Sequence, residues 1–168
     1  MVRCGYALAM KMRPGFLLVC LAGLLGVGGC AKPARKADPA PQHPYRAPHQ
    51  GTIVVLGRDE FHVEFVRDPQ TGTLTAYLFD STVKIPVRSK SSGFEVVATV
   101  GGEKRPLAFT PQPDTARNEA PGDTARFTAQ ADWLKSTSKF EAELSSIKLL
   151  NTTFLRVKFP FPAGNEKH

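Results

Sequence analysis

Apolar and polar residues alternate along most of the chain after residue 51. Phe61, Val63 and Phe65 alternate with polar residues, and six later stretches show the same period of two. This period is typical of a strand with one buried face, because successive side chains point to opposite sides. The predicted inward faces span residues 61–65, 74–78, 83–87, 94–100, 127–131, 140–144 and 155–161.

Turn-forming residues separate these stretches. Residues 68–72, Asp-Pro-Gln-Thr-Gly, and the pair Gly101-Gly102 each lie between two apolar faces. Strands at a spacing of about ten residues predict an antiparallel sandwich or barrel. We therefore predict an all-β domain over residues 49–162, a single antiparallel β-sandwich (Ig-like) of about seven to eight strands. Pro86 lacks an N–H, so we expect its strand, 83–87, at an edge of the sheet.

Two segments interrupt the alternation. Residues 110–124 contain three prolines and a glycine, and we expect them to form the longest loop. Residues 131–135 have room for a single helical turn at a strand crossing. No longer stretch shows a helical period.

The first 29 residues have a different pattern. Arg3, Lys11 and Arg13 are their charged residues, and an apolar run over 16–25 is followed by small residues. A positive start, a short apolar stretch and small residues are the layout of a secretory signal. The apolar stretch is shorter than the roughly 20 residues that a membrane-spanning helix requires. We therefore predict that residues 1–29 are an export signal.

The residues that end this segment indicate the kind of signal. Val27-Gly28-Gly29-Cys30 resembles the lipobox of bacterial lipoproteins. The resemblance implies that the thiol of Cys30 receives diacylglycerol, that the chain is cleaved just before it, and that the mature protein is anchored in a lipid bilayer. An ordinary signal peptide with a cysteine at its end, and a retained N-terminal anchor, are the alternatives. We expect a cell-envelope lipoprotein facing the periplasm, on the outer rather than the inner membrane because Ala31 follows the cysteine.

The next segment cannot form a core. Residues 30–48 contain five prolines and few bulky apolar residues, so we predict a lipidated cysteine followed by an extended tether. We also expect residues 163–168 to be a disordered tail. Without the signal, 19 cations face 15 acids, spread along the chain. Nucleic-acid binding would need a clustered basic patch, so no nucleic-acid partner is expected, whereas a protein partner in the envelope is compatible with this chain.

Candidate metal ligands are few. Cys4, Cys20 and all three methionines lie in the predicted signal, so soft-metal sites and disulfides are disfavoured. His62 lies on the polar face of its strand with Glu64, and we expect it to be exposed or to cover the sheet, paired with a carboxylate or hydroxyl. The alternative is a zinc or copper(II) site of His49, His62 and Glu64. Against this site, His49 is expected near the far end of that strand, around Phe65 to Arg67, rather than beside His62.

Enzyme chemistry has no sequence support. The chain has no G-x-S-x-G, no H-E-x-x-H, no phosphate-binding loop and no pairing of a cysteine with a histidine. We therefore predict a non-catalytic protein with no cofactor, a divalent metal being the alternative. Tyr45 and Tyr77 are aromatic residues that either cover the sheet or serve a binding surface.

Three stretches together resemble a group of uncharacterised bacterial lipoproteins and periplasmic domains. They are the stretches 49–57 (His-Gln-Gly-Thr-Ile-Val-Val-Leu-Gly), 61–66 (Phe-His-Val-Glu-Phe-Val) and 72–80 (Gly-Thr-Leu-Thr-Ala-Tyr-Leu-Phe-Asp). The group's pattern is His-Gly-Gly, an apolar strand, apolar-His-apolar-Glu, and Leu-x-x-Tyr-x-x-Asp. Gln50 stands where the group has its first glycine. Some members occur in heavy-metal contexts, so the resemblance implies that a metal-handling role is worth testing.

Overall fold

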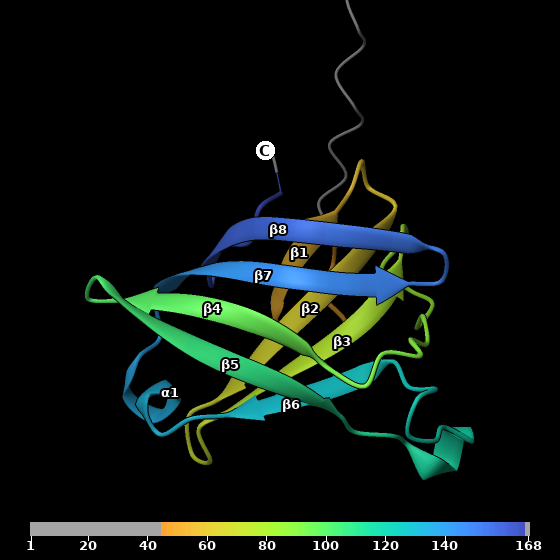
Figure 1. Cartoon of the computed structure of the whole chain (residues 1–168), viewed down its shortest axis with the longest axis horizontal. Helices are drawn as coiled ribbons and strands as arrows, with labels where there is room; N and C mark the ends of the chain where they lie inside the picture. The colour runs from red at the N-terminus through yellow and green to blue at the C-terminus, as the bar shows by residue number, and fades with distance from the viewer. Residues whose placement is uncertain (1–44, 167–168) are drawn as a thin grey trace, which may run out of the picture. The chain divides into compact units, whose positions relative to one another are not determined.

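Eight antiparallel strands form the folded part of the chain in the computed structural model, which describes residues 45–166 (Figure 1). One helical turn, α1, and one 3-10 turn, η1, are the helical elements within these residues. In chain order the elements are β1 (Thr52–Leu56), β2 (Phe61–Asp68), β3 (Thr73–Asp80), β4 (Phe94–Val100), β5 (Glu103–Pro111), η1 (Thr115–Arg117), β6 (Arg126–Gln130), α1 (Trp133–Ser136), β7 (Phe140–Leu149) and β8 (Thr152–Phe161).

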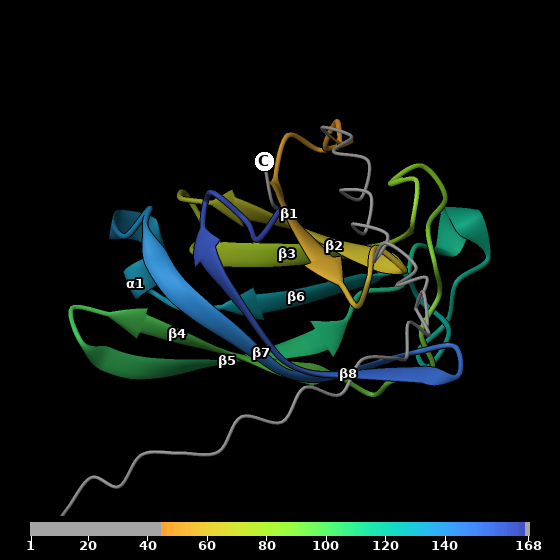
Figure 2. The same ribbon diagram turned by 90° about the horizontal axis from the view of Figure 1, so that it is seen from above.

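The strands follow one continuous hydrogen-bonded order, β1-β2-β3-β6-β5-β4-β7-β8. By pairing, β1, β2, β3 and β6 form one layer and β4, β5, β7 and β8 the other, and in Figure 2 β7 and β8 curve from the second layer towards β1. β5 joins the layers, because it pairs with β4 from Glu103 to Phe109 and with β6 through Thr110 and Pro111. The prediction of an all-β antiparallel domain with seven to eight strands is confirmed, and the single helical turn lies where it was expected.

The C-terminal segment brings the two ends of this order together. The side-chain amide of Asn165 donates to the backbone oxygen of Val55 at 3.2 Å, and its oxygen accepts from the Val55 N–H at 2.7 Å. The hydroxyl of Thr52 donates to the carbonyl of Pro162. Residues 163–166 therefore complete the exposed edge of β1, in contrast to the disordered tail expected there. The result is a nearly closed, barrel-like arrangement.

Aromatic side chains fill the space between the two layers. Phe65, Phe109, Phe127 and Phe159 are all almost completely buried. The rings of Phe65 and Phe159 stack with their centroids 5.0 Å apart, which joins β2 to β8. Burial of such side chains is the main favourable contribution to folding, at about 2 kcal/mol each. The inward faces predicted from alternation supply most of this core.

The period of two shifts in the middle of β8. Arg156 has a φ of 52°, which marks an irregular position in the strand. Before it Phe154 is buried and Leu155 is 66% exposed, whereas after it Phe159 and Phe161 are buried. The prediction that Leu155 faces the core is therefore wrong, because a strand that changes its conformation at one residue also exchanges its two faces.

Two segments differ from the predicted strands. Residues 83–87 form a loop with one bridge, Phe79 to Pro86, rather than an edge strand. The loop is held by Asp80, whose Oδ1 accepts from the N–H groups of Thr82 and Ile85. β5 was not predicted, because Pro106 breaks its alternation of apolar and polar residues and only two of its side chains, Leu107 and Phe109, are buried hydrophobics.

Candidate functional site

Glu64 is a completely buried carboxylate on the outer face of β2. Its Oε1 accepts from the N–H groups of His49 and Gly51, each at 2.8 Å. Its Oε2 lies 2.8 Å from Nδ1 of His49. A charge is costly to bury unless hydrogen bonds replace its water, and bonds to a carboxylate are among the strongest in proteins. Glu64 thereby fixes the chain just before β1 over the sheet.

The backbone at residues 50 and 51 makes this docking sterically possible. The N–H of Gln50 donates to the carbonyl of Ala47, and Gln50 has a φ of 60°, a conformation in which glycine is favoured. A Cβ on Gly51 would lie 2.6 Å from the carbonyl oxygen of Phe65. Residues 45–51 consequently fold back over β2 as a strap, the name used below for this segment.

The strap brings His49 onto the neighbouring strand. Its ring stacks on Tyr77 of β3 with a centroid distance of 3.8 Å and an interplanar angle of 12°. Tyr77 is the cross-strand partner of Glu64, so the strap contacts both residues of the pair. His49 was expected around Phe65 to Arg67 rather than beside His62, and its ring lies against Glu64, the neighbour of Phe65, while His62 has other partners.

His62 belongs to a second set of contacts on the same face. Its Nδ1 lies 3.0 Å from the backbone oxygen of Asp80, and its Nε2 lies 2.9 Å from Oδ1 of Asp59. The Nε2 contact lacks the geometry of a hydrogen bond. His62 is completely buried, because the ring of Tyr45 lies over its ring with the two centroids 4.3 Å apart. Of the two positions expected for His62, exposed to solvent or covering the sheet beside a carboxylate, the structure shows the second, with Asp59 as the carboxylate.

Tyr45 closes this set of contacts. Its hydroxyl donates to Oδ2 of Asp59. Burial, the hydrogen bond to Asp59 and the charge of that carboxylate raise the pKa of Tyr45 to about 12. The phenol therefore stays protonated at physiological pH and serves as a donor. Tyr45 was placed in the tether by composition, whereas its contacts make it the first residue of the strap.

The three candidate metal ligands do not form one cluster. His49 and Glu64 are in contact, whereas His62 makes its contacts with Asp59 and Asp80. In residues 45–166 no group of three or more histidine, cysteine, aspartate or glutamate side chains is arranged to hold a metal ion. Cys30, the predicted lipidation site, lies outside the described residues.

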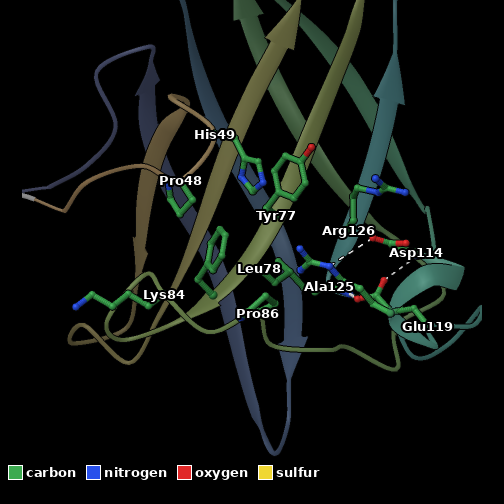
Figure 3. A pocket seen from close by; sticks show the side chains of 12 residues that line it. Pro48, His49, Tyr77, Leu78, Lys84, Pro86, Asp114, Glu119, Ala125 and Arg126 are labelled. Carbon is green, nitrogen blue, oxygen red and sulfur yellow. Dashed lines mark hydrogen bonds and ion pairs between the residues drawn. The ribbon is translucent and has the colours of Figure 1, made fainter.

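A pocket of about 320 Å³ lies next to the strap (Figure 3). Pro48 and His49 of the strap, Tyr77 of β3 and Arg126 of β6 are among its lining residues. Tyr77 and Arg126 are cross-strand partners, and their side chains extend the row that begins at Glu64. The sequence marked His49 and Tyr77 individually but gave no sign of this pocket, because Arg126 is distant from them in the chain.

The opposite wall of the pocket is the loop between β5 and β6. Buried Glu119 accepts from the Thr124 hydroxyl at 2.7 Å and from the Asp114 N–H at 3.0 Å. Burial by itself would raise the pKa of Glu119, but these hydrogen bonds, the Ala125 N–H and the charge of Arg88 together hold it below its usual value. The long loop predicted at 110–124 is therefore an ordered wall.

No protein-family model matches the chain, and no match was found among curated proteins or solved structures. Within residues 45–166 no helix is long and apolar enough to cross a membrane.

Proposed function

We propose that this protein is a membrane-anchored lipoprotein facing the periplasm, with a non-catalytic β-domain that binds a ligand. The anchoring part is carried by the sequence Val27-Gly28-Gly29-Cys30, which follows a short apolar run and a basic start. The binding part is supported by the pocket beside the strap, since ligand sites in proteins are concave and combine apolar walls with a few polar groups.

The strap is consistent with a tethered domain. The 14 residues between Cys30 and Tyr45 can reach at most about 50 Å when fully extended. The strap that follows them is fixed to the sheet by three contacts with Glu64. The tether joins the domain at the strap, and His49 of the strap lines the pocket. The length of the tether therefore limits how far the pocket can lie from the anchor.

Replacing the cysteine tests the anchor. A Cys30→Ala variant should lose lipid labelling and leave the membrane fraction. The variant has no thiol to carry the acyl chains that hold a lipoprotein on the bilayer. A Cys20→Ala variant is the matched control, since it removes a cysteine of the predicted signal and should remain in the membrane fraction. Sedimentation of the Cys30→Ala variant with membranes after a high-salt wash would contradict the proposal.

A metal-binding accessory role through His49, His62 and Glu64 is the second candidate. The observation that favours it is the fold-back that brings His49 to Glu64. The observation that disfavours it is that both Glu64 oxygens already accept from, or contact, nitrogen atoms of the strap. A metal ion would have to displace these contacts and bring His62 away from Asp80.

Titration of Zn(II) and Cu(II) into the full chain separates the two candidates. We expect no binding tighter than about 1 μM that depends on His49 and His62. His43→Ala and His168→Ala are the matched controls, since both histidines lie outside residues 45–166. Tight binding that is lost in His49→Ala and in His62→Ala, but kept in the two controls, would establish the metal role instead.

A further inference from the structure

The pocket beside the strap has an apolar floor and a flat aromatic wall. Phe79 and Ala125 are buried apolar residues that line it. The rings of Tyr77 and His49 lie face to face at its edge (Figure 3). Tyr77 is only partly buried, and its hydroxyl has no hydrogen-bond partner within residues 45–166. A flat apolar group can therefore bury its surface here beside a free polar group.

The acidic residues of the pocket are already engaged. Glu119 accepts from Thr124 and from two backbone N–H groups, as described above. Asp114 accepts from the N–H of Ala116 at 3.1 Å and lies 3.5 Å from Nε of Arg117. These carboxylates hold the wall together, so they have little capacity left for a cation.

The basic residues of the pocket are less engaged. Nε of Arg126 donates to the carbonyl of Gln112 at 3.1 Å, and its two terminal nitrogens have no partner in the described part of the chain. Arg117 makes one long contact with Asp114, and Lys84 at the rim forms no ion pair with residues 45–166. The pocket thus has three cationic side chains, Lys84, Arg117 and Arg126, and its two carboxylates are already hydrogen-bonded. It therefore has more N–H donors than acceptors available to a ligand. Planar guanidinium groups bind carboxylates especially well.

We propose that this pocket binds a small organic anion, a carboxylate carried on a flat apolar group. The carboxylate contacts Arg117 and Arg126, and the flat group lies against Tyr77. This inference rests on the proposed function and specifies the class of its ligand. The preference for an anion arises because a carboxylate forms charge-assisted hydrogen bonds with the guanidinium groups, which are stronger than those of a neutral acceptor.

Benzoate and benzamide are suitable probes, because they have nearly the same size and differ in charge. They are titrated into the full chain carrying Cys30→Ala, which leaves residues 45–166 unchanged, and the backbone N–H signals of Tyr77 and Ala125 are followed by NMR. We expect saturable shifts with benzoate at a dissociation constant of about 1 mM. Benzamide should bind at least about tenfold more weakly.

Variants test whether the two arginines carry the preference. The double variant Arg117→Gln with Arg126→Gln should weaken benzoate binding at least about tenfold while its melting temperature stays near that of the parent. Lys139→Gln is the matched control, because Lys139 is an exposed cation outside the pocket. It should leave the affinity for benzoate unchanged.

The outcomes separate this inference from the proposed function. Equal binding of the two probes, or full affinity in the double arginine variant, would overturn the anion preference and leave a binding role in place. Absence of saturable shifts with both probes up to about 20 mM would overturn the inference together with the binding part of the function. The membrane test with Cys30→Ala is independent of all these results.

Discussion

Glu64 determines how the chain crosses the outer face of β1, β2 and β3. Its carboxylate is completely buried and contacts two backbone N–H groups and the ring of His49. Removing it would leave buried donors without an acceptor, which costs more than the loss of an exposed hydrogen bond. The attachment of the strap at His49 and Gly51 thus depends on one side chain.

Replacing Glu64 by alanine should lower the free energy of unfolding by about 3 kcal/mol. Urea unfolding of the domain measures this change. Glu141→Ala is the matched control, because Glu141 is an exposed strand glutamate of β7 and its loss should cost less than about 0.5 kcal/mol. Equal stability of the two variants would show that Glu64 does not hold the strap.

Glu119 should make the domain sensitive to acid. Its folded-state pKa lies below the usual 4.5, mainly because hydrogen bonds outweigh the effect of burial. A depressed pKa adds stability at pH values above the unfolded-state pKa, and this stability is lost as the pH falls through the folded-state pKa. The melting temperature should therefore fall more steeply below pH 4.5 in the parent than in Glu119→Gln. Glu141→Gln should keep the parent's dependence, and a parallel fall in all three proteins would refute the assignment.

At the scale of elements, β1 depends on a segment distant from it in sequence. Its outer edge would expose the N–H and C=O of Val55, and both groups bond to the side chain of Asn165. An unpaired edge strand is a site of fraying and of pairing with other chains. The C-terminal segment thus acts as a short substitute for a ninth strand.

Asn165→Ala should destabilise the domain by about 1–2 kcal/mol, because two hydrogen bonds are lost. Hydrogen exchange of the Val55 amide should become faster, while exchange of core amides in β4 changes less. Asn151→Ala in the exposed turn between β7 and β8 is the control and should change neither. Unchanged exchange at Val55 in Asn165→Ala would show that the edge does not need this side chain.

The loop between β5 and β6 is a second element fixed from outside itself. Nη1 of Arg88 donates to Oδ2 of Asp123 at 2.9 Å, and Nη2 donates to the carbonyl of Arg117. These bonds come from the segment after β3, so the wall of the pocket is tied to the strand that carries Tyr77.

Arg88→Gln should loosen this wall without unfolding the domain. We expect faster proteolysis within residues 112–124 and faster exchange of their amides, because the fork-shaped guanidinium bonds to three groups of the loop at once. Lys90→Gln, which removes an exposed cation from the same segment, is the matched control. Equal rates of proteolysis in the two variants would contradict a role for Arg88.

At the scale of the whole molecule, the strap belongs to the folded unit. A fragment of residues 45–166 should give a cooperative melt and a strand-dominated far-UV spectrum, with helix content well below the roughly one third of an average domain. A fragment of 52–166 should melt at a clearly lower temperature or fail to fold, because Glu64 loses its donors and His62 its cover. Removing only residues 31–44 is the control. Equal melting of the two fragments would place the strap outside the folded unit.

The alternation of apolar and polar residues made one part of the fold predictable and left another part open. The buried rows on β2, β3, β4, β6 and β7 were predictable, because a period of two identifies the apolar side of each strand. It does not report whether the other side meets water. His62 and Glu64 looked like members of a polar face, yet the strap covers both.

The sequence alone determined an all-β antiparallel domain, because its repeated alternation requires each strand to bury one face against another. The tertiary structure decided which polar residues are buried, where β8 exchanges its faces and how the pocket is assembled. Its decisive contacts join distant segments: His49 to Glu64, Val55 to Asn165, and Arg88 to the loop before β6. Such contacts depend on how the chain turns back at single residues such as Gln50, and no local period of apolar residues encodes that turn.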